Sequence, residues 1–481
     1  MFRTTPHYSR RQMLQASGLG FGSLALAGLL RDAGLLASDS NVDQSVPKDL
    51  KPRSGHSDGR AKAVIQLFQN GGPSQMDLFD PKPELTKRDG QPHPGEVETF
   101  QLGNKNVLMK SPFKFSQHGE CGMDFGETVP HMASVADDWC MIRTMHTHNN
   151  NHPFAINSFQ TGNQFAGRPA IGSWICYALG TENQNLPGYI VLRDPEGYNT
   201  SGKMVWSSGW LPALYQGTEV GSTGSAVLHL HPSDQLPPAA QRRSLQLLAE
   251  LNQLHLARHP TESELEARIE NFELAARMQL QAEGILDISR ETEETRRLYG
   301  LDKQATAGYG TRLLMARRLV EAGVRFVQVF PPLKPDFQPW DNHSNIPGGI
   351  REISSHTDQP SAALIRDLKR RGLLDEVLVV WSGEFGRLPI TEGKDGRDHN
   401  RHAATLLMAG GGMQSGMIYG KTDEFGYQSV ENRVSVHDLH ATILHLLGIN
   451  HRRLAYRHSG RPERLTDPEV TGARVLEELL A

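Results

Sequence analysis

Side chains that ligate metals occur in four separated segments of this chain. Each of the segments GGPSQMD, PWDNHSN, GRDHNRH and SGEFGR contains acidic or imidazole side chains together with glycine or asparagine. The last of them follows the apolar run EVLVVW. Mixed imidazole and carboxylate ligands suit zinc, manganese or iron, and carboxylate-rich sets suit magnesium or calcium. The pattern predicts a site for divalent metal, with zinc, manganese, calcium and magnesium as the candidates and one or two ions as the alternatives. The candidate ligands are Asp77, Asp341, His343, Glu384, His399 and His402.

Each candidate also has an ordinary interpretation when it is taken alone. Asp341 is a common residue type in turns, and His399 and His402 fit exposed polar positions. Glu384 is more informative, because a carboxylate directly after a buried strand lies at the edge where α/β sheets bind ligands. A fifth segment, HTHNNNH, ends at His152, and its three asparagines favour a loop. Convergence of these segments is therefore the main argument for a site.

The elements around these segments alternate between strands and helices. Strands are predicted at Ala63–Phe68, at 324–330, at 376–381 and within HAATLLMAGGG, and helices at PSAALIRDLKRRG and SVHDLHATILHLLGI. This order indicates an α/β fold with a mainly parallel sheet flanked by helices on both faces. Apolar residues spaced three and four apart between about 234 and 300 predict a helical insertion. In such a sheet the polar segments fall at the carboxyl ends of the strands.

The N-terminus has the pattern of an export signal. Arg10 and Arg11 precede a mild run of glycine, alanine and leucine, as in twin-arginine signals. We therefore expect a signal peptide at 1–37, a flexible polar leader at 38–60 and an α/β domain at 61–481, in a protein exported to the periplasm or beyond through the twin-arginine machinery. No later stretch of the sequence is apolar enough to predict a membrane span.

Charge argues against one class of function. Removing residues 1–37 takes away four arginines and one aspartate, so the formal net charge moves from −4 to −7. A mildly acidic exported protein is a poor candidate for binding nucleic acid. The three cysteines are far apart and do not form a zinc motif on their own.

The chain resembles a family known as domain of unknown function 1501, an exported, sulfatase-like branch of the alkaline phosphatase superfamily. The resemblance rests on FQNGGPSQMDLFDPKPEL, SFQTG, WDNH, VVWSGEFGR, GRDHNRHAATLLMAGGG and DLHATILHLLGI, which with the twin-arginine start span nearly the whole sequence. It implies an alkaline-phosphatase/sulfatase-like α/β fold. It also implies a pocket for up to two metal ions with a serine, threonine or cysteine-derived nucleophile that attacks phosphate or sulfate esters.

Three positions depart from the pattern that the resemblance implies. Asn70 stands where sulfatases have a metal-binding aspartate, and Glu384-Phe385-Gly386 replaces Asp-His-Gly. Counting back nine residues from Thr161 to the nucleophile position leads to His152. Without a nucleophile, the covalent route is closed unless Thr147 or Ser158 takes that part.

These observations predict a secreted, metal-dependent hydrolase of sulfate or phosphate esters that works by metal-activated water. His152 is expected to act as a general base or a replacement ligand. Arg387 or Arg401 is expected to hold an anionic group of an ester or polysaccharide substrate. The alternative is a non-catalytic envelope or carbohydrate-binding protein on a degenerate sulfatase-like fold. Another type of metalloenzyme is a third possibility, for which no dinucleotide-binding motif gives support.

Overall fold

A computed structural model describes residues 49–101, 106–221, 284–333 and 338–481, together with 243–255 except 245, 249 and 253. These residues belong to the compact unit Lys48–Ala481. The predicted signal peptide and residues 38–48 of the predicted leader lie outside the described residues. So does most of the predicted helical insertion, of which the described parts between 243 and 255 and between 293 and 298 are helical.

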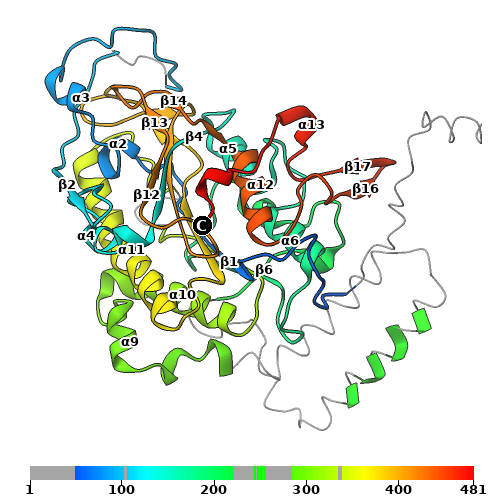
Figure 1. Ribbon diagram of the computed structural model, residues 1–481. Helices are drawn as coiled ribbons and strands as arrows, with labels where there is room; N and C mark the ends of the chain where they lie inside the picture. Colours follow the sequence, from blue (N-terminus) through cyan, green and yellow to red (C-terminus); the bar gives the residue numbers. More distant parts are fainter. Residues whose placement is uncertain are drawn as a thin grey trace, which may run out of the picture. The chain divides into compact units, whose positions relative to one another are not determined.

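A mixed, mainly parallel sheet forms the centre of the described unit (Figure 1). Its strand order is β12-β4-β11-β8-β1-β7-β5-β6, and β15 pairs with β4 beside this path. Only β11 runs against its neighbours among these strands. The strands are β1 (Ala63–Phe68), β4 (Cys140–His146), β5 (Tyr189–Leu192), β6 (Thr218–Glu219), β7 (Phe326–Val329), β8 (Val377–Ser382), β11 (Ala404–Ala409), β12 (Met417–Tyr419) and β15 (Val434–Ser435).

The apolar strands are buried over their whole length, as the central strands of a sheet covered on both faces must be. All six residues of β1, of β8 and of β11 are buried. Strand β1 lies between two parallel partners, so that Ile65 is in register with Val327 of β7 and with Val379 of β8. The predicted α/β class with a mainly parallel, helix-flanked sheet is confirmed.

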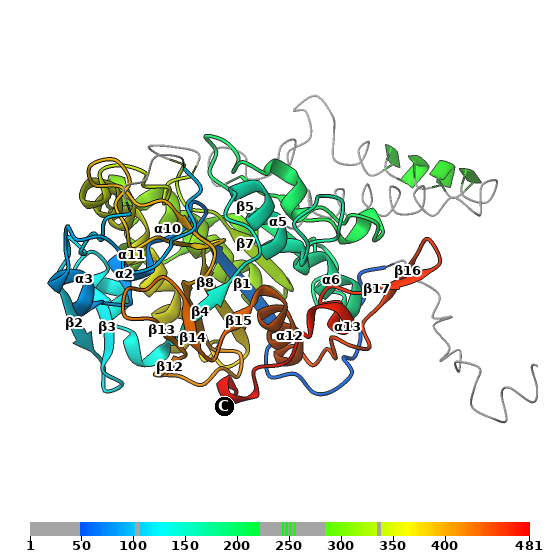
Figure 2. The same cartoon turned by 90° about the horizontal axis from the view of Figure 1, so that it is seen from above.

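Helices cover both faces of the sheet (Figures 1 and 2). Phe68, at the end of β1, packs against Phe159 of α5, whereas the next residue, Gln69, donates a hydrogen bond to Tyr309 of α10 on the other face. The helices are α2 (Gln75–Leu78), α3 (Pro83–Lys87), α4 (Pro130–Ala133), α5 (His152–Thr161), α6 (Ile171–Leu179), α9 (Glu293–Leu298), α10 (Gln304–Glu321), α11 (Ile346–Arg370), α12 (Val436–Leu446) and α13 (Pro468–Thr471). None of the described helices combines the length and the apolar character needed to cross a bilayer.

Four small two-stranded sheets complete the described unit. They pair β2 (Phe115–His118) with β3 (Met123–Gly126), β9 (Gly386–Arg387) with β10 (His399–Asn400), β13 (Lys421–Thr422) with β14 (Ser429–Glu431), and β16 (Tyr456–His458) with β17 (Arg461–Glu463). The β9–β10 pair places His399 opposite Arg387. It thereby joins two segments of the predicted metal site.

Two local features differ from the sequence predictions. Residues 49–60 were placed in a flexible leader, but Arg53 and His56 donate backbone hydrogen bonds to Leu179 and Gly448, so this part is bound to the domain. Helix α11 begins at Ile346, well before Pro360, where the helix was predicted to start. Pro360 lies inside the helix, and Asn345 caps the true N-terminus by accepting a hydrogen bond from the backbone N–H of Gly348.

Helix α12 is held to α5 by buried histidines rather than by metal ligands. His440 is fully buried, and its Nε2 donates a 2.8 Å hydrogen bond to the carbonyl oxygen of Phe159. Burial, with a smaller effect from neighbouring His437, lowers the pKa of His440 from 6.5 to about 3. The imidazole is therefore neutral in the fold and takes up a proton on unfolding in mild acid.

This shift predicts a pH dependence of stability. A lowered folded-state pKa stabilises the fold fully above pH 6.5, and the contribution falls as the pH drops toward 3. Between pH 7.5 and pH 5, His440 should account for a loss of about 2 kcal/mol. We expect His440→Gln, which keeps a donor for Phe159, to lose less unfolding free energy than wild type over this range. Urea unfolding at both pH values measures the difference, and equal losses would contradict the assignment.

Candidate metal centre

Strands β1, β4, β7 and β8 are mutually parallel in the sheet, so their carboxyl ends meet at one edge. The loops that follow them bring Gly71, His152, Asp341 and Glu384 to that edge. Because β11 runs antiparallel, its amino end lies at the same edge, and His399, five residues before it, joins them. The predicted position of the site at the carboxyl edge agrees with this geometry.

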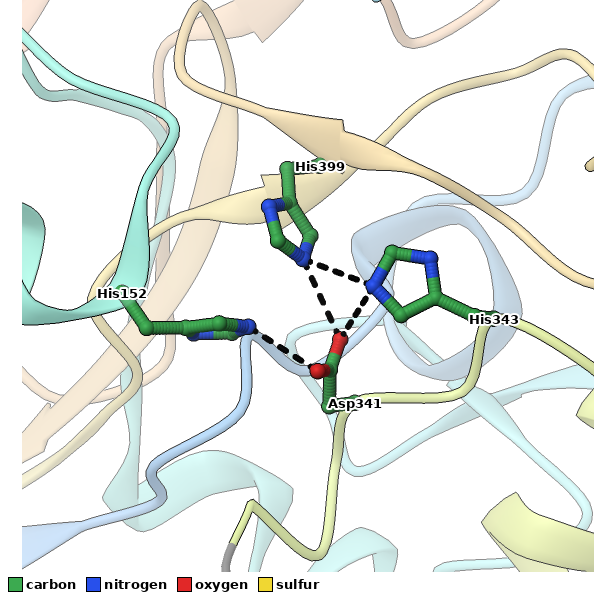
Figure 3. A group of neighbouring side chains, drawn as sticks. All are labelled: His152, Asp341, His343 and His399. Atoms are coloured by element: carbon green, nitrogen blue, oxygen red, sulfur yellow. Dashed lines mark hydrogen bonds and ion pairs between the residues drawn. The ribbon is translucent and has the colours of Figure 1, made fainter. Parts of the chain in front are cut away.

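Four side chains from three segments point toward one another at this edge (Figure 3). His343 Nε2 lies 2.9 Å and His399 Nε2 lies 3.2 Å from Asp341 Oδ1, and these two nitrogens are 2.9 Å apart. His152 Nε2 approaches Asp341 Oδ2 to 3.1 Å without the alignment of a hydrogen bond. One atom from each of the four residues lies within 4.8 Å of the other three. We call His152, Asp341, His343 and His399 the ligand cluster.

Each imidazole of the ligand cluster is oriented by its other nitrogen. His152 Nδ1 contacts Glu384 Oε1 at 2.6 Å, and His399 Nδ1 donates to the carbonyl oxygen of Asn150 at 2.6 Å. His343 Nδ1 bonds to Glu392. These partners are acceptors, so they place the proton of a neutral imidazole on Nδ1 and leave the Nε2 lone pair facing Asp341. Metal-ligating histidines in proteins are typically held in this way.

Arg387 determines the charge state of Asp341. Burial would raise the pKa of Asp341, but the Arg387 guanidinium, whose Nη2 donates to Oδ1 at 2.5 Å, and the histidines together hold that pKa well below its usual range. Asp341 is therefore an anion that three histidines share. Its side chain and that of His343 keep about a quarter of their area exposed, which leaves the cluster open on this side.

The charge on Asp341 acts differently on the surrounding histidines. Burial lowers the pKa values of His152 and His343, but Asp341, with Glu384 or Glu392, more than offsets this and raises both. Burial prevails at His399, whose pKa falls to about 4 although the hydrogen bond to Asp341 raises it. The cluster thus favours holding a positive charge between its members.

Arg387, predicted to hold an anionic substrate group, has a different place in the structure. It is fully buried, and its guanidinium donates to the carbonyl oxygens of Gly71, Gly72 and Arg397 as well as to Asp341. These bonds leave it directed at the protein rather than at a ligand. Gly71 permits the close approach of the loops, because its φ is +110° and a Cβ there would lie 2.8 Å from the backbone nitrogen of Asp341.

Glu384 lies behind the ligand cluster instead of within it. Its carboxylate is fully buried, accepts the backbone N–H of Gly71 at 2.9 Å and contacts His152 Nδ1. Its role in this geometry is to orient His152. The neighbouring ring of Phe385 lies 4.8 Å from the His152 ring and 4.7 Å from the His399 ring, so an aromatic side chain closes one side of the cluster.

Besides Glu384, two predicted ligands lie outside the cluster, and neither contacts it. Asp77 is fully buried and forms a two-point ion pair with Arg397, at 2.7 Å and 3.1 Å, so a guanidinium occupies the place expected for a cation. His402 Nε2 contacts Glu98 at 2.9 Å instead. The physical reason is the same for both, since a charged partner from a distant loop satisfies each side chain.

Phe100 and Gln101 cover part of the site. The ring of Phe100 stacks on His399 with 4.8 Å between centroids and 26° between planes. The backbone N–H groups of Phe100 and Gln101 both donate to Asp398 Oδ2 at 2.8 Å. Asp398 therefore positions this cover rather than joining the ligand cluster.

Comparison with known proteins identifies the family. The sequence model of a family described as "Protein of unknown function (DUF1501)" matches residues 61–480. None of the curated proteins matches the chain.

Solved structures similar to this chain include three enzymes. The PsFucS1 sulfatase of Pseudoalteromonas sp. is 13% identical, with 81% of this chain and 68% of that chain covered and a TM-score of 0.34. A phosphonate monoester hydrolase of Silicibacter pomeroyi is 14% identical, with 73% of each chain covered and a TM-score of 0.34. Alkaline phosphatase from the Antarctic bacterium TAB5 is 12% identical, with 80% and 98% covered and a TM-score of 0.30.

Proposed function

The chain belongs to the DUF1501 family, and from the geometry of its ligand cluster we propose that it is a metal-dependent hydrolase of sulfate or phosphate esters. The proposal rests on the close approach of two imidazole nitrogens to the Asp341 carboxylate. His343 Nε2, His399 Nε2 and Asp341 Oδ1 lie within 3.2 Å of one another, and each imidazole is held with its proton on the far nitrogen. Two imidazole nitrogens and a carboxylate oxygen so close repel unless a proton or a metal ion lies between them, and the open side of the cluster allows a metal ion to take that place.

The donor set fits a divalent transition metal. His152, His343 and His399 would supply three imidazole nitrogens and Asp341 one carboxylate oxygen. Tetrahedral bonds of about 2.0–2.1 Å place ligand atoms about 3.3 Å apart, close to the separations in the cluster. Three nitrogens favour zinc, and iron or manganese after it, over magnesium or calcium. When bound, such an ion lowers the pKa of water and polarises an ester oxygen.

The protein's own residues orient and shield this site. Glu384, Glu392 and the Asn150 carbonyl hold the three imidazoles, and Arg387 keeps Asp341 ionised. Phe385 restricts water on one side. With Nε2 turned to Asp341, His152 has the geometry of a replacement ligand rather than of a free base, and it stands where the resemblance implies a covalent nucleophile.

The wider setting of the reaction is also a proposal. The paired Arg10 and Arg11 support export through the twin-arginine machinery, which carries folded proteins and therefore metal that is bound beforehand. An exported hydrolase of this type would meet anionic esters of extracellular polysaccharides. The exposed side of the cluster, at Asp341 and His343, is where such an ester would enter.

Metal analysis tests the proposal directly. We expect protein purified without chelator or nickel resin to carry about one equivalent of metal, mainly zinc. His343→Ala/His399→Ala should carry almost none, because half of the ligands are gone, whereas His437→Gln, which alters a buried histidine outside the cluster, should retain it. Hydrolysis of 4-nitrophenyl sulfate and 4-nitrophenyl phosphate by the loaded protein completes the test.

The outcomes separate the two candidate functions. Metal with ester turnover supports the hydrolase. Metal without turnover of any sulfate or phosphate ester favours the non-catalytic binding protein, for which the histidine at the nucleophile position is the favouring observation. Metal-free wild-type protein whose melting is unchanged by chelator overturns the metal centre itself.

A further inference from the structure

Basic residues gather on a two-stranded arm far along the chain from the ligand cluster. Strands β16 and β17 form a hairpin that projects from the domain beside α6 (Figures 1 and 2). Its turn, Ser459-Gly460, has positive φ at both residues, as a tight two-residue hairpin requires. Between 452 and 464 the acidic residue is Glu463, and the arginines are Arg452, Arg453, Arg457, Arg461 and Arg464.

The positive charge is concentrated on the hairpin and is exposed to solvent. The whole chain has a net charge of −4, so the arm opposes the general balance. Arg457 and Arg461 are exposed, and neither has an ion-pair partner within the part of the chain that the structure describes. These two arginines therefore do not stabilise the hairpin through ion pairs. Arginines of this kind bind sulfate and phosphate groups through paired N–H donors.

Aromatic side chains lead from the ligand cluster toward this arm. Phe154, two residues after His152, pairs edge-on with Phe165, and these rings are 40% and 62% exposed. The loop that carries Phe165 folds back along α5, since Asn157 Nδ2 donates to the carbonyl oxygen of Gln164. Two large exposed rings in contact form an apolar surface that a binding partner covers better than water does.

A stacked group continues from that loop to the hairpin. The Arg168 guanidinium lies 5.3 Å from the centroid of the Trp210 ring, and this ring stacks on His458 of β16 at 5.2 Å and 17°. Glu463 of β17 lies 3.7 Å from Arg168. We call Phe154, Phe165, Arg168, Trp210 and the hairpin arginines Arg457 and Arg461 the aromatic–basic track.

The track has the length of a polymer site. Helix α5 begins at the ligand cluster and ends at Thr161, and its ten residues span about 15 Å. Gly162 then packs against the carbonyl oxygen of Leu465, just after the hairpin. A ligand reaching from His152 to Arg457 must therefore exceed the size of a simple ester. Flat rings suit the faces of sugar residues, and the arginines suit anionic substituents.

We infer that the aromatic–basic track binds a sulfated polysaccharide and leads one of its ester groups to the ligand cluster. The inference rests on the proposed function for the identity of that ester. A lipid surface fits less well, because the hairpin tip, Ser459-Gly460, has no apolar side chain to insert. Nucleic acid fits less well because of the acidic balance of the chain.

Binding of the full chain to ι-carrageenan, a sulfated galactan, tests the track in calorimetry or on an optical sensor. We expect Arg457→Ala/Arg461→Ala to weaken binding at least tenfold at low salt, with a smaller effect at high salt. Phe165→Ala should weaken it about fivefold at both salt concentrations, since apolar contact is not screened. Arg290→Ala/Arg296→Ala removes the same charge from exposed positions before and within α9 and should bind as wild type does.

Each result decides between stated alternatives. The inference is overturned if both track variants bind the polymer as tightly as wild type does, or if the chemically desulfated galactan binds as well as the sulfated one. It is also overturned if duplex DNA or anionic vesicles bind more tightly than ι-carrageenan. The proposed function is read separately, from hydrolysis of 4-nitrophenyl sulfate and 4-nitrophenyl phosphate. Track-dependent polymer binding without hydrolysis of either 4-nitrophenyl sulfate or 4-nitrophenyl phosphate rejects the hydrolase and keeps the track. Hydrolysis of either ester, with wild-type polymer binding in both track variants, keeps the hydrolase and rejects the track.

Discussion

Asp341→Asn is expected to leave the protein folded and to abolish binding of the proposed metal ion. The amide has the shape of the carboxylate, but it cannot serve as an anion shared by His152, His343 and His399. It also leaves the Arg387 guanidinium, 2.5 Å from Oδ1 in the wild type, without its counter-charge. A cation in the cluster would then face an uncompensated positive charge in a buried setting.

We expect this variant to lose more than the roughly 10–100-fold in metal affinity that removal of an outer partner costs. Elemental analysis after dialysis and a zinc titration measure the effect, and turnover of 4-nitrophenyl sulfate should fall to background. Asp358→Asn is the matched control, because Asp358 is also buried but accepts the backbone N–H groups of His131 and Met132 outside the cluster. A full complement of metal in Asp341→Asn would show that the Asp341 carboxylate is not required for metal binding, and a full complement in His343→Ala/His399→Ala as well would show that the cluster is not the metal site.

Much of the cluster could be anticipated because sheet geometry follows from apolar runs. Strands such as β1 and β8 read as continuous apolar segments, and a parallel sheet brings their carboxyl ends to one edge. Asp341 and His343 were expected there, and the structure brings them together with His399 and His152. The DUF1501 resemblance is confirmed by the family match over residues 61–480.

The partners of His343 and His399 carry no such signal. Glu392 lies in the polar loop TEGKDG, where a glutamate is an ordinary exposed residue, and its contact with His343 arises only in the folded chain. The Asn150 group that orients His399 is a backbone carbonyl, which every residue has. The reversed direction of β11 is equally invisible, because an antiparallel strand buried on both faces has the same apolar run as a parallel one.

Asp77 was predicted to bind a metal ion from its residue type and position, but its partner in the structure is an arginine. A carboxylate soon after the first strand has the position of a metal ligand, but the cation that meets it is Arg397, in the loop between β9 and β10. Arg397 lies in the segment GRDHNRH beside Asp398 and His399, and nothing in its sequence position indicates that it pairs with Asp77. Both members of the pair are fully excluded from solvent, and Ser74 Oγ completes the set by donating to Asp77 at 2.5 Å.

Asp77→Asn should therefore reduce stability without affecting the proposed metal site. Breaking a buried ion pair from one side leaves Arg397 charged and uncompensated, at a cost of about 3–5 kcal/mol in unfolding free energy. Asp77→Leu/Arg397→Met removes both charges and should regain about half of the loss, the remainder reflecting the carbonyl oxygens of Met109 and Leu388 that lose their donor. Denaturant unfolding and metal content of the same preparations separate the roles. A folded Asp77→Asn that has lost its metal would place Asp77 among the ligands, whereas a metal-bearing, destabilised variant would leave it as the anion that fixes Arg397 beneath the site.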